Sequence, residues 1–168
     1  QPTVEPRSQI EVQVSGPGVA GAVERTDSMG CVLFVVKPPT TGGDYVVTIL
    51  GNTGGQAYVN LSSEVTETKT EYSVQPQQVR TIRFENYDQA ASVTANVTLG
   101  GGGTADSVTL TPLGGTAGPV TATVVGGVAN FDAVYPTTYS VETQPTPCLP
   151  NSITVAPGEN QTIDVVIP

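Results

Sequence analysis

Few side chains in this sequence could take part in catalysis, because the chain contains no His and only two Cys. Carboxylates are the main remaining candidates for acid–base work, and the densest cluster of them is Glu64, Glu67 and Glu71. These acids are interleaved with threonines, which is more typical of a solvated strand or loop than of a catalytic pair. We therefore expect a protein that is not an enzyme and that has no catalytic residues.

Two other segments resemble ligand sites only in part. Asp27, Ser28 and Gly30 suggest a calcium loop, but the further acidic ligands at alternate positions are missing. The four glycines at residues 100–103 have the composition of a phosphate loop without the Lys or the helix that such a loop needs, so we expect a hairpin tip. The sequence therefore predicts neither a metal nor a cofactor.

Three asparagines begin triplets that satisfy the N-glycosylation sequon: Asn60, Asn96 and Asn160. Such triplets also arise by chance in a chain rich in Thr and Ser. They are candidate glycosylation sites only where the source organism glycosylates its proteins.

The charge of the chain excludes several classes of partner. The net charge is −9, all six basic residues lie within residues 1–88, and residues 89–168 contain five acids and no base. Nucleic acids and anionic membranes both require clustered Lys and Arg, so neither is expected as a partner. The longest apolar run, residues 31–36, is far shorter than a membrane span, and the chain opens on Gln1 with no signal segment. We expect an exported, processed ectodomain located outside the cell or on its surface.

The elements that carry these residues are predicted to be β-strands. The chain has 26 Val and 24 Thr beside 19 Gly and 14 Pro, a profile of strand formers separated by turn residues. The strands recur at the short intervals of a β-sandwich. The predicted fold class is all-β.

An internal repeat divides the chain in two. Residues 74–84 align without gaps on residues 155–165, and residues 30–34 and 44–49 match residues 127–131 and 138–143 in the same order. We predict an N-terminal extension at residues 1–7 and two antiparallel β-sandwich domains at residues 8–88 and 89–168. The opening strands, residues 8–15 and 91–99, are interpreted as counterparts.

The repeat also assigns the faces of one strand. Phe131 alternates with polar neighbours and is predicted to face the core, so Phe34 at the matching position faces inward as well. Cys31, Leu33 and Val35 then face outward and form an apolar stripe, in which Leu33 and Val35 are a possible interface. The stripe is either covered by the companion domain, reserved for another molecule, or part of a strand buried on both faces of one thick sandwich.

The pattern from Thr26 to Phe34, followed by two prolines and the strand at residues 44–49, resembles the signature of transthyretin-like, carboxypeptidase-regulatory-like and Cna-B-type domains. Asp27 can close an Asx turn there, and Gly30 permits a positive φ. The resemblance implies two tandem Ig-like or transthyretin-like sandwiches, and the Cys after Gly30 is similar to that of pilin-like surface proteins of Gram-positive bacteria.

The two cysteines occupy non-equivalent places in the repeat. Because two Cys in an exported chain are more often paired than free, we predict a disulfide between Cys31 and Cys148 that links the two domains. The competing interpretation keeps Cys31 as a buried free thiol and Cys148 as an intermolecular link or a bystander.

We expect a non-enzymatic structural or adhesive module, the ectodomain of a pilin-like or other cell-surface filament subunit. Its partners would be other envelope or filament subunits, including copies of itself. The alternative is a carbohydrate-binding accessory module of a secreted protein. A glycan would stack on exposed aromatic rings, for which Tyr58, Tyr72 and Tyr87 are the candidates.

Overall fold

The computed structural model describes residues 9–53, 56–100, 105–114, 117–150 and 152–168. Within these ranges the chain forms fourteen strands and no helix, which confirms the prediction of an all-β protein. No described segment is a helix that could cross a membrane. The predicted N-terminal extension at residues 1–7, and three of the glycines at residues 100–103, lie outside the described residues.

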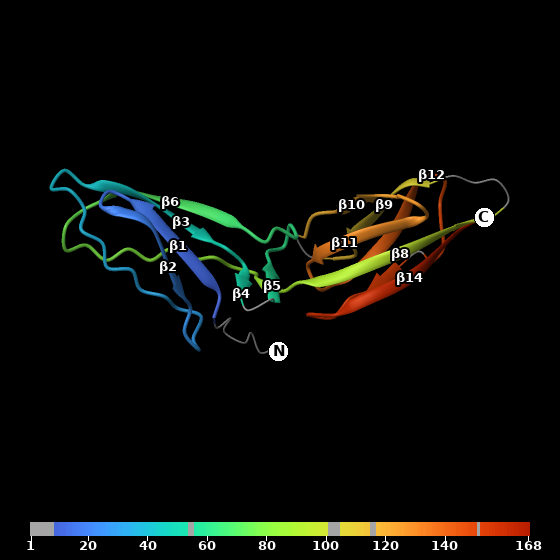
Figure 1. Cartoon of the computed structure of the whole chain (residues 1–168), viewed down its shortest axis with the longest axis horizontal. Helices are drawn as coiled ribbons and strands as arrows, with labels where there is room; N and C mark the ends of the chain where they lie inside the picture. Colours follow the sequence, from blue (N-terminus) through green and yellow to red (C-terminus); the bar gives the residue numbers. More distant parts are fainter. Residues whose placement is uncertain (1–8, 54–55, 101–104, 115–116, 151) are drawn as a thin grey trace. The chain divides into compact units, whose positions relative to one another are not determined.

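Two compact units make up the chain (Figure 1). Unit 1 contains the described residues up to Tyr58 together with Val65–Tyr87, and unit 2 contains Val59–Glu64 and Asp88–Pro168. Residues 59–64 lie within the predicted first domain of residues 8–88 but cluster with unit 2. Val59 is fully buried, and the Leu61 carbonyl accepts a hydrogen bond of 3.1 Å from the Gly118 amide.

Unit 1 is built on one antiparallel four-stranded sheet in the order β2-β1-β3-β6. Val12 and Val14 alternate with polar residues along β1, so both valines are buried while their neighbours in the strand are half-buried. The bounds of the strands that start in this unit are β1 (Glu11–Gly16), β2 (Val19–Arg25), β3 (Gly43–Ile49), β4 (Asn52–Thr53), β5 (Gln56–Val59) and β6 (Glu67–Val74).

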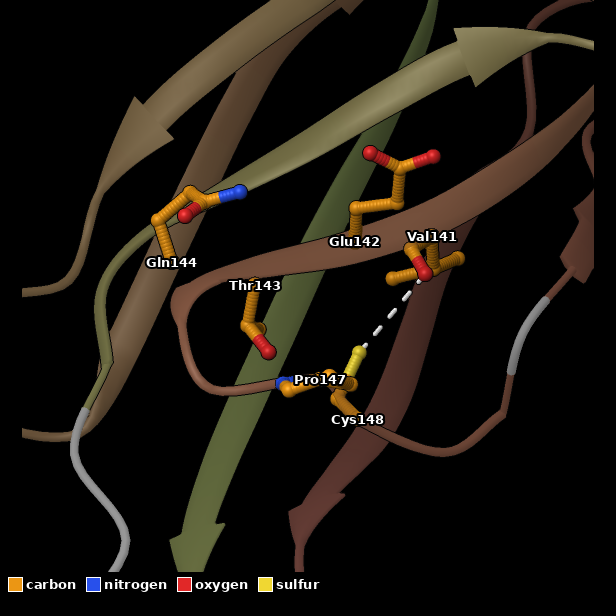
Figure 2. A pocket seen from close by; sticks show the side chains of 6 residues that line it. All are labelled: Val141, Glu142, Thr143, Gln144, Pro147 and Cys148. Carbon is orange, nitrogen blue, oxygen red and sulfur yellow. Dashed lines mark hydrogen bonds between the residues drawn. The ribbon is translucent and has the colours of Figure 1, made fainter.

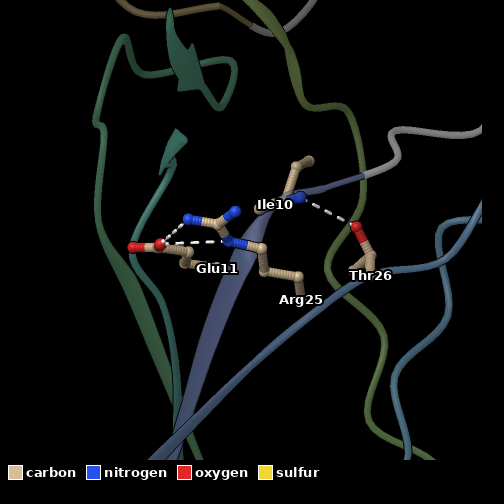
Figure 3. Close-up of polar contacts among 4 residues, drawn as sticks. All are labelled: Ile10, Glu11, Arg25 and Thr26. Atoms are coloured by element: carbon tan, nitrogen blue, oxygen red, sulfur yellow. Dashed lines mark hydrogen bonds and ion pairs between the residues drawn. The ribbon is translucent and has the colours of Figure 1, made fainter. Parts of the chain in front are cut away.

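Two polar contacts define the open end of β1 and β2 (Figure 3). The buried Thr26 hydroxyl accepts a hydrogen bond of 2.9 Å from the Ile10 amide. The neighbouring pair is exposed: the Arg25 guanidinium donates to the Glu11 carboxylate at 2.8 Å. The first contact satisfies a buried backbone donor, so it contributes more to stability than the second, which water screens.

Unit 2 contains two sheets, one in the order β10-β9-β12-β13 and one in the order β11-β8-β14. In the second sheet, β8 is the central strand, antiparallel to β11 and parallel to β14. The strand bounds are β7 (Asp88–Gln89), β8 (Ala91–Leu99), β9 (Ala105–Pro112), β10 (Val120–Thr123), β11 (Val128–Val134), β12 (Thr138–Pro145), β13 (Ser152–Thr154) and β14 (Asn160–Ile167).

The register corrects one expectation about the repeat. Val14 pairs with Val47 in unit 1, and Leu110 pairs with Val141 at the matching place in unit 2, so β1 corresponds to β9. The predicted equivalence of residues 8–15 with residues 91–99 is therefore wrong. Both strands alternate apolar and polar residues in the same way, and this pattern alone cannot tell them apart. As a result, β8 has no counterpart among the described residues of unit 1.

The cores of the two units differ accordingly. Unit 2 has one continuous cluster of sixteen buried residues, which includes Ala91, Val93 and Ala95 of β8. Unit 1 has two clusters of three buried residues each, one around Val12 and one around Val14. Without an equivalent of β8, the described part of unit 1 buries less apolar surface, and its core is divided.

Candidate functional site

The most distinctive surface of unit 1 is an extended stretch at residues 31–36, which we call the Phe34 segment. Its side chains alternate between exposed and half-buried, as the repeat predicted: Leu33 is 78% exposed and Val35 is 90% exposed, while Phe34 packs on the core. The interpretation in which this strand is buried on both faces is therefore wrong. Exposed apolar side chains in a row are typical of a contact surface.

The Phe34 segment corresponds to β11 of unit 2, and the two differ in what they present to solvent. At the positions of Leu33 and Val35, β11 has the exposed Asn130 and Asp132. Facing inward, Phe131 is 4% exposed, whereas Phe34 is only half-buried. The Phe34 segment therefore leaves apolar surface exposed to solvent on both of its faces.

The backbone of the Phe34 segment has no partner strand. Residues 31–39 are not part of any sheet, and no described residue forms a hydrogen bond with a backbone group of residues 32–37. In unit 2, β11 pairs along β8. Extended backbone with unpaired N–H and C=O groups is a template for strand addition.

A second extended stretch, residues 79–85, matches β14 and also lies outside the sheets; we call it the Phe84 segment. Contacts with side chains of β6, rather than strand-ladder hydrogen bonds, hold the Phe84 segment. The Lys69 ammonium donates to the Arg83 carbonyl and lies 4.9 Å from the centre of the Phe84 ring, and Arg80 is 3.4 Å from Glu71. Phe84 and Phe34 both pack on the cluster around Val12.

The acidic cluster is engaged in separate structural contacts. Glu67 lies 3.3 Å from Lys69 and accepts a hydrogen bond from the Tyr87 hydroxyl, while Glu71 pairs with Arg80. Glu64 accepts a hydrogen bond from the Asn60 amide group at 3.0 Å. These carboxylates stabilise loops and strands, and the geometry brings no two of them together as an acid and a base.

The turn before the Phe34 segment has the form expected from its sequence. One carboxylate oxygen of Asp27 accepts the amides of Met29 and Cys31 at 2.8 and 2.9 Å, and Gly30 has a φ of 73°. The predicted Asx turn is therefore confirmed. Within the described part of the chain, no three His, Cys, Asp or Glu side chains are grouped so that they could hold a metal ion.

Both cysteines are free in this structure, so the predicted Cys31–Cys148 disulfide is not formed. Cys31 is exposed, in agreement with its outward assignment. Cys148 is buried in the core of unit 2, where its thiol lies 3.7 Å from the Val141 carbonyl. A thiol buried inside a core is shielded from a second Cys, and the spacing of residues along the sequence could not reveal this.

A shallow, open pocket of about 290 Å³ lies beside Cys148 (Figure 2). Among the described residues that line it, none has a cationic or imidazole group that could activate the thiol, and Glu142 is the only charged one. The described lining therefore gives the Cys148 thiol no activating partner. Its lining residues are Val141, Glu142, Thr143, Gln144, Pro147 and Cys148.

The sequon asparagines are used in hydrogen bonds that order their surroundings. The Asn60 carbonyl oxygen accepts the amides of Ser62 and Glu64, each at 3.0 Å. Asn96 donates to Asp164 at 3.2 Å, and Asn160 accepts from the Ser92 hydroxyl at 2.6 Å. Asn160 is exposed, whereas Asn60 and Asn96 are half-buried, so Asn160 is the most accessible of the three.

The tyrosines considered for glycan stacking do not form a common platform. Tyr72 is 67% exposed on β6, but Tyr58 and Tyr87 are half-buried and pack on the cluster around Val12. Stacking on a sugar needs an open ring face, which of these three only Tyr72 clearly offers.

The sequence-based predictions do not include two extended segments outside the sheets, although the repeat contained the relevant signal. Residues 74–84 align with residues 155–165, which include most of β14, while nothing upstream of β1 aligns with β8. A repeat alignment that lacks one strand predicts an incomplete sheet. Comparisons with known proteins give no further guide: no family model, no curated protein and no solved structure matches this chain.

Proposed function

We propose that this chain is a non-enzymatic structural or adhesive module of an extracellular filament or other cell-surface assembly. In this proposal its two units are tandem β-sandwiches of the Ig-like or transthyretin-like kind. The resemblance of residues 26–49 to such domains supports this interpretation, as does the matching order of elements in the two units.

One observation carries the proposal: the outward face of the Phe34 segment is apolar where its counterpart in unit 2 is polar. Leu33 and Val35 are the most exposed apolar side chains of this segment, and each leaves most of its surface in water. Covering them against a neighbouring subunit would contribute about 25 cal/mol for each Å² of apolar surface removed from water. The proposed partners are neighbouring envelope or filament subunits, including copies of this chain.

The test is self-association of the full chain, measured by sedimentation velocity and negative-stain electron microscopy. We expect association at high micromolar concentration and filaments in the concentrated sample. The double substitution L33D/V35D should weaken association about tenfold or more, which corresponds to about 1.4 kcal/mol. Val125→Asp is the matched control, because Val125 is an exposed valine of unit 2.

A wild-type protein that remains monomeric at millimolar concentration would contradict the proposal. So would an L33D/V35D variant that associates as the wild type does. Specific retention on a glycan array, lost in Tyr72→Ala, would favour the carbohydrate-binding alternative instead.

A further inference from the structure

Unit 1 has the two outer strands of a three-stranded sheet without the strand between them. In unit 2 the equivalent sheet is complete, in the order β11-β8-β14. The Phe34 segment corresponds to β11 and the Phe84 segment to β14, and both are extended and lie outside the sheets. The position that β8 fills in unit 2 therefore has no equivalent strand among the described residues of unit 1.

Three pairs of equivalent residues show the effect of the missing strand on the core. Phe131, Ile163 and Val165 of unit 2 are 4%, 8% and 0% exposed. Their counterparts in unit 1 are Phe34, Ile82 and Phe84, and all three are only half-buried. The inward side chains of β8, which are Ala91, Val93 and Ala95, are part of the core that covers the first set.

We propose that unit 1 is completed by a β-strand donated by a neighbouring polypeptide chain. The strand would lie antiparallel to the Phe34 segment and parallel to the Phe84 segment, as β8 lies between β11 and β14. Its backbone would pair with both segments, and its side chains would fill the divided core. This inference deepens the proposed function and rests on it, because it names what one subunit receives from the next.

The structure of unit 2 defines the chemistry of this donor. Along β8, small apolar residues point inward at alternate positions, and Ser, Thr and Asn point outward. A donor strand should therefore have small apolar residues at every second position over about eight residues. It should contain no Pro, because a central strand needs its amides for both neighbours.

The chain's own residues 1–8 have a different composition. They contain Pro2 and Pro6, and Val4 is their only other apolar residue. A segment with this composition can neither complete a hydrogen-bond ladder on both sides nor fill a core. The composition therefore favours a strand from another chain over residues 1–8 as the occupant.

The first experiment adds a synthetic peptide with the sequence of β8, residues 91–99, to the full chain. Hydrogen exchange is then followed by mass spectrometry. We expect amides of the Phe34 and Phe84 segments to exchange about tenfold more slowly with the peptide bound, because they gain ladder hydrogen bonds. The same peptide with Ala95→Pro is the matched control and should give no protection. Protection of neither segment by the β8 peptide would overturn the inference.

The second experiment supplies the strand in cis. The register aligns Ala105 with Gln9, so residues 91–104 are grafted ahead of Gln9 in place of residues 1–8. We expect both segments of this variant to be protected and its self-association to be reduced at least tenfold, because the position is already filled. A graft that folds but leaves the segments unprotected would also overturn the inference.

A third experiment tests whether residues 1–8 of the same chain, rather than a strand from another chain, occupy the position. Deleting them should leave exchange of the Phe34 segment unchanged, and faster exchange on deletion would show that the strand is the chain's own. The outcomes also separate this inference from the proposed function. If the peptide binds but the full chain does not assemble, only the proposed role in an assembly is contradicted. If the full chain assembles and neither the peptide nor the graft inhibits assembly, only the donated strand is contradicted.

Discussion

At the scale of single residues, Tyr139 is a buried group whose ionisation is coupled to folding. Its side chain is fully buried in unit 2, and its hydroxyl donates a hydrogen bond to the Tyr135 carbonyl. Burial raises the pKa of Tyr139 above its ordinary value of 10.0, because the phenolate would lose its hydration. The Ser63 side chain opposes this shift, and Tyr135 adds to it.

Unit 2 is therefore expected to lose stability in alkali. The unfolded chain releases the Tyr139 proton near pH 10, below the pKa of the folded state, so the free energy of unfolding falls as the pH rises beyond that point. Tyr139→Phe should reduce this fall, at a cost of about 1 kcal/mol at neutral pH for the lost hydrogen bond. Urea unfolding at a series of pH values measures how the free energy of unfolding changes with pH. Tyr72→Phe, at an exposed position, is the control. An equal fall of this free energy above pH 10 in wild type and Tyr139→Phe would contradict the prediction.

The two thiols should differ in reactivity. Iodoacetamide should modify Cys31 in the native protein and reach Cys148 only after unfolding, since one is exposed and the other is buried. Intact mass should show one adduct under native conditions and two in denaturant. A protein that takes up no adduct in denaturant, and whose mass is lower by two hydrogens, would instead contain the disulfide that the sequence predicted.

The contacts in Figure 3 provide a comparison between a buried and an exposed polar contact. Thr26→Val keeps the shape of the side chain but leaves the Ile10 amide without its hydroxyl acceptor, so unit 1 should lose about 2 kcal/mol of stability. Arg25→Gln removes only an exposed ion pair and should cost less than about 0.5 kcal/mol. Native-state hydrogen exchange of β1 amides measures both; similar losses for the two variants would show that the buried amide is satisfied in another way.

At the scale of elements, equivalent strands in the two units provide a matched pair of substitutions. Phe131→Ala removes a ring that is 4% exposed and should destabilise unit 2 by about 3–5 kcal/mol. Phe34→Ala, at the equivalent half-buried position, should cost unit 1 about half as much, because less surface is buried and the site opens to water. Exchange of core amides in each unit reports the two losses separately, and equal losses would mean that the Phe34 segment is as well covered as β11.

The sequence predicts the elements better than it predicts their pairing. Val and Thr content gave the all-β class, the repeat gave the inward direction of Phe34, and the turn at Asp27 and Gly30 has its predicted geometry. Alternation is a property of one strand, however, and does not say which strand lies beside it. For this reason alternation predicts that β1 is equivalent to β8, whereas the register makes β1 equivalent to β9. The burial of Cys148 likewise depends on packing between sheets, which local pattern does not encode.

At the scale of the whole molecule, the two units should unfold separately. Unit 2 has sixteen residues in one buried cluster and unit 1 has two clusters of three, so unit 1 should open at a lower free energy. Exchange measured in increasing urea should show amides of β1 and β3 losing protection before those of β8 and β9. Loss of protection in both units at the same urea concentration would contradict this expectation.

The parallel pairing of β8 with β14 also has a mechanical consequence. These are the first and last strands of the large sheets of unit 2, and eight residue pairs join them, from Ser92 with Asn160 to Leu99 with Ile167. Tension applied to the start of β8 and the end of β14 pulls two parallel strands in opposite directions along their length. All the hydrogen bonds between them then share the load and must rupture together. Unit 1 has no such pair among its described strands, so under load it would extend first unless a donated strand held it closed.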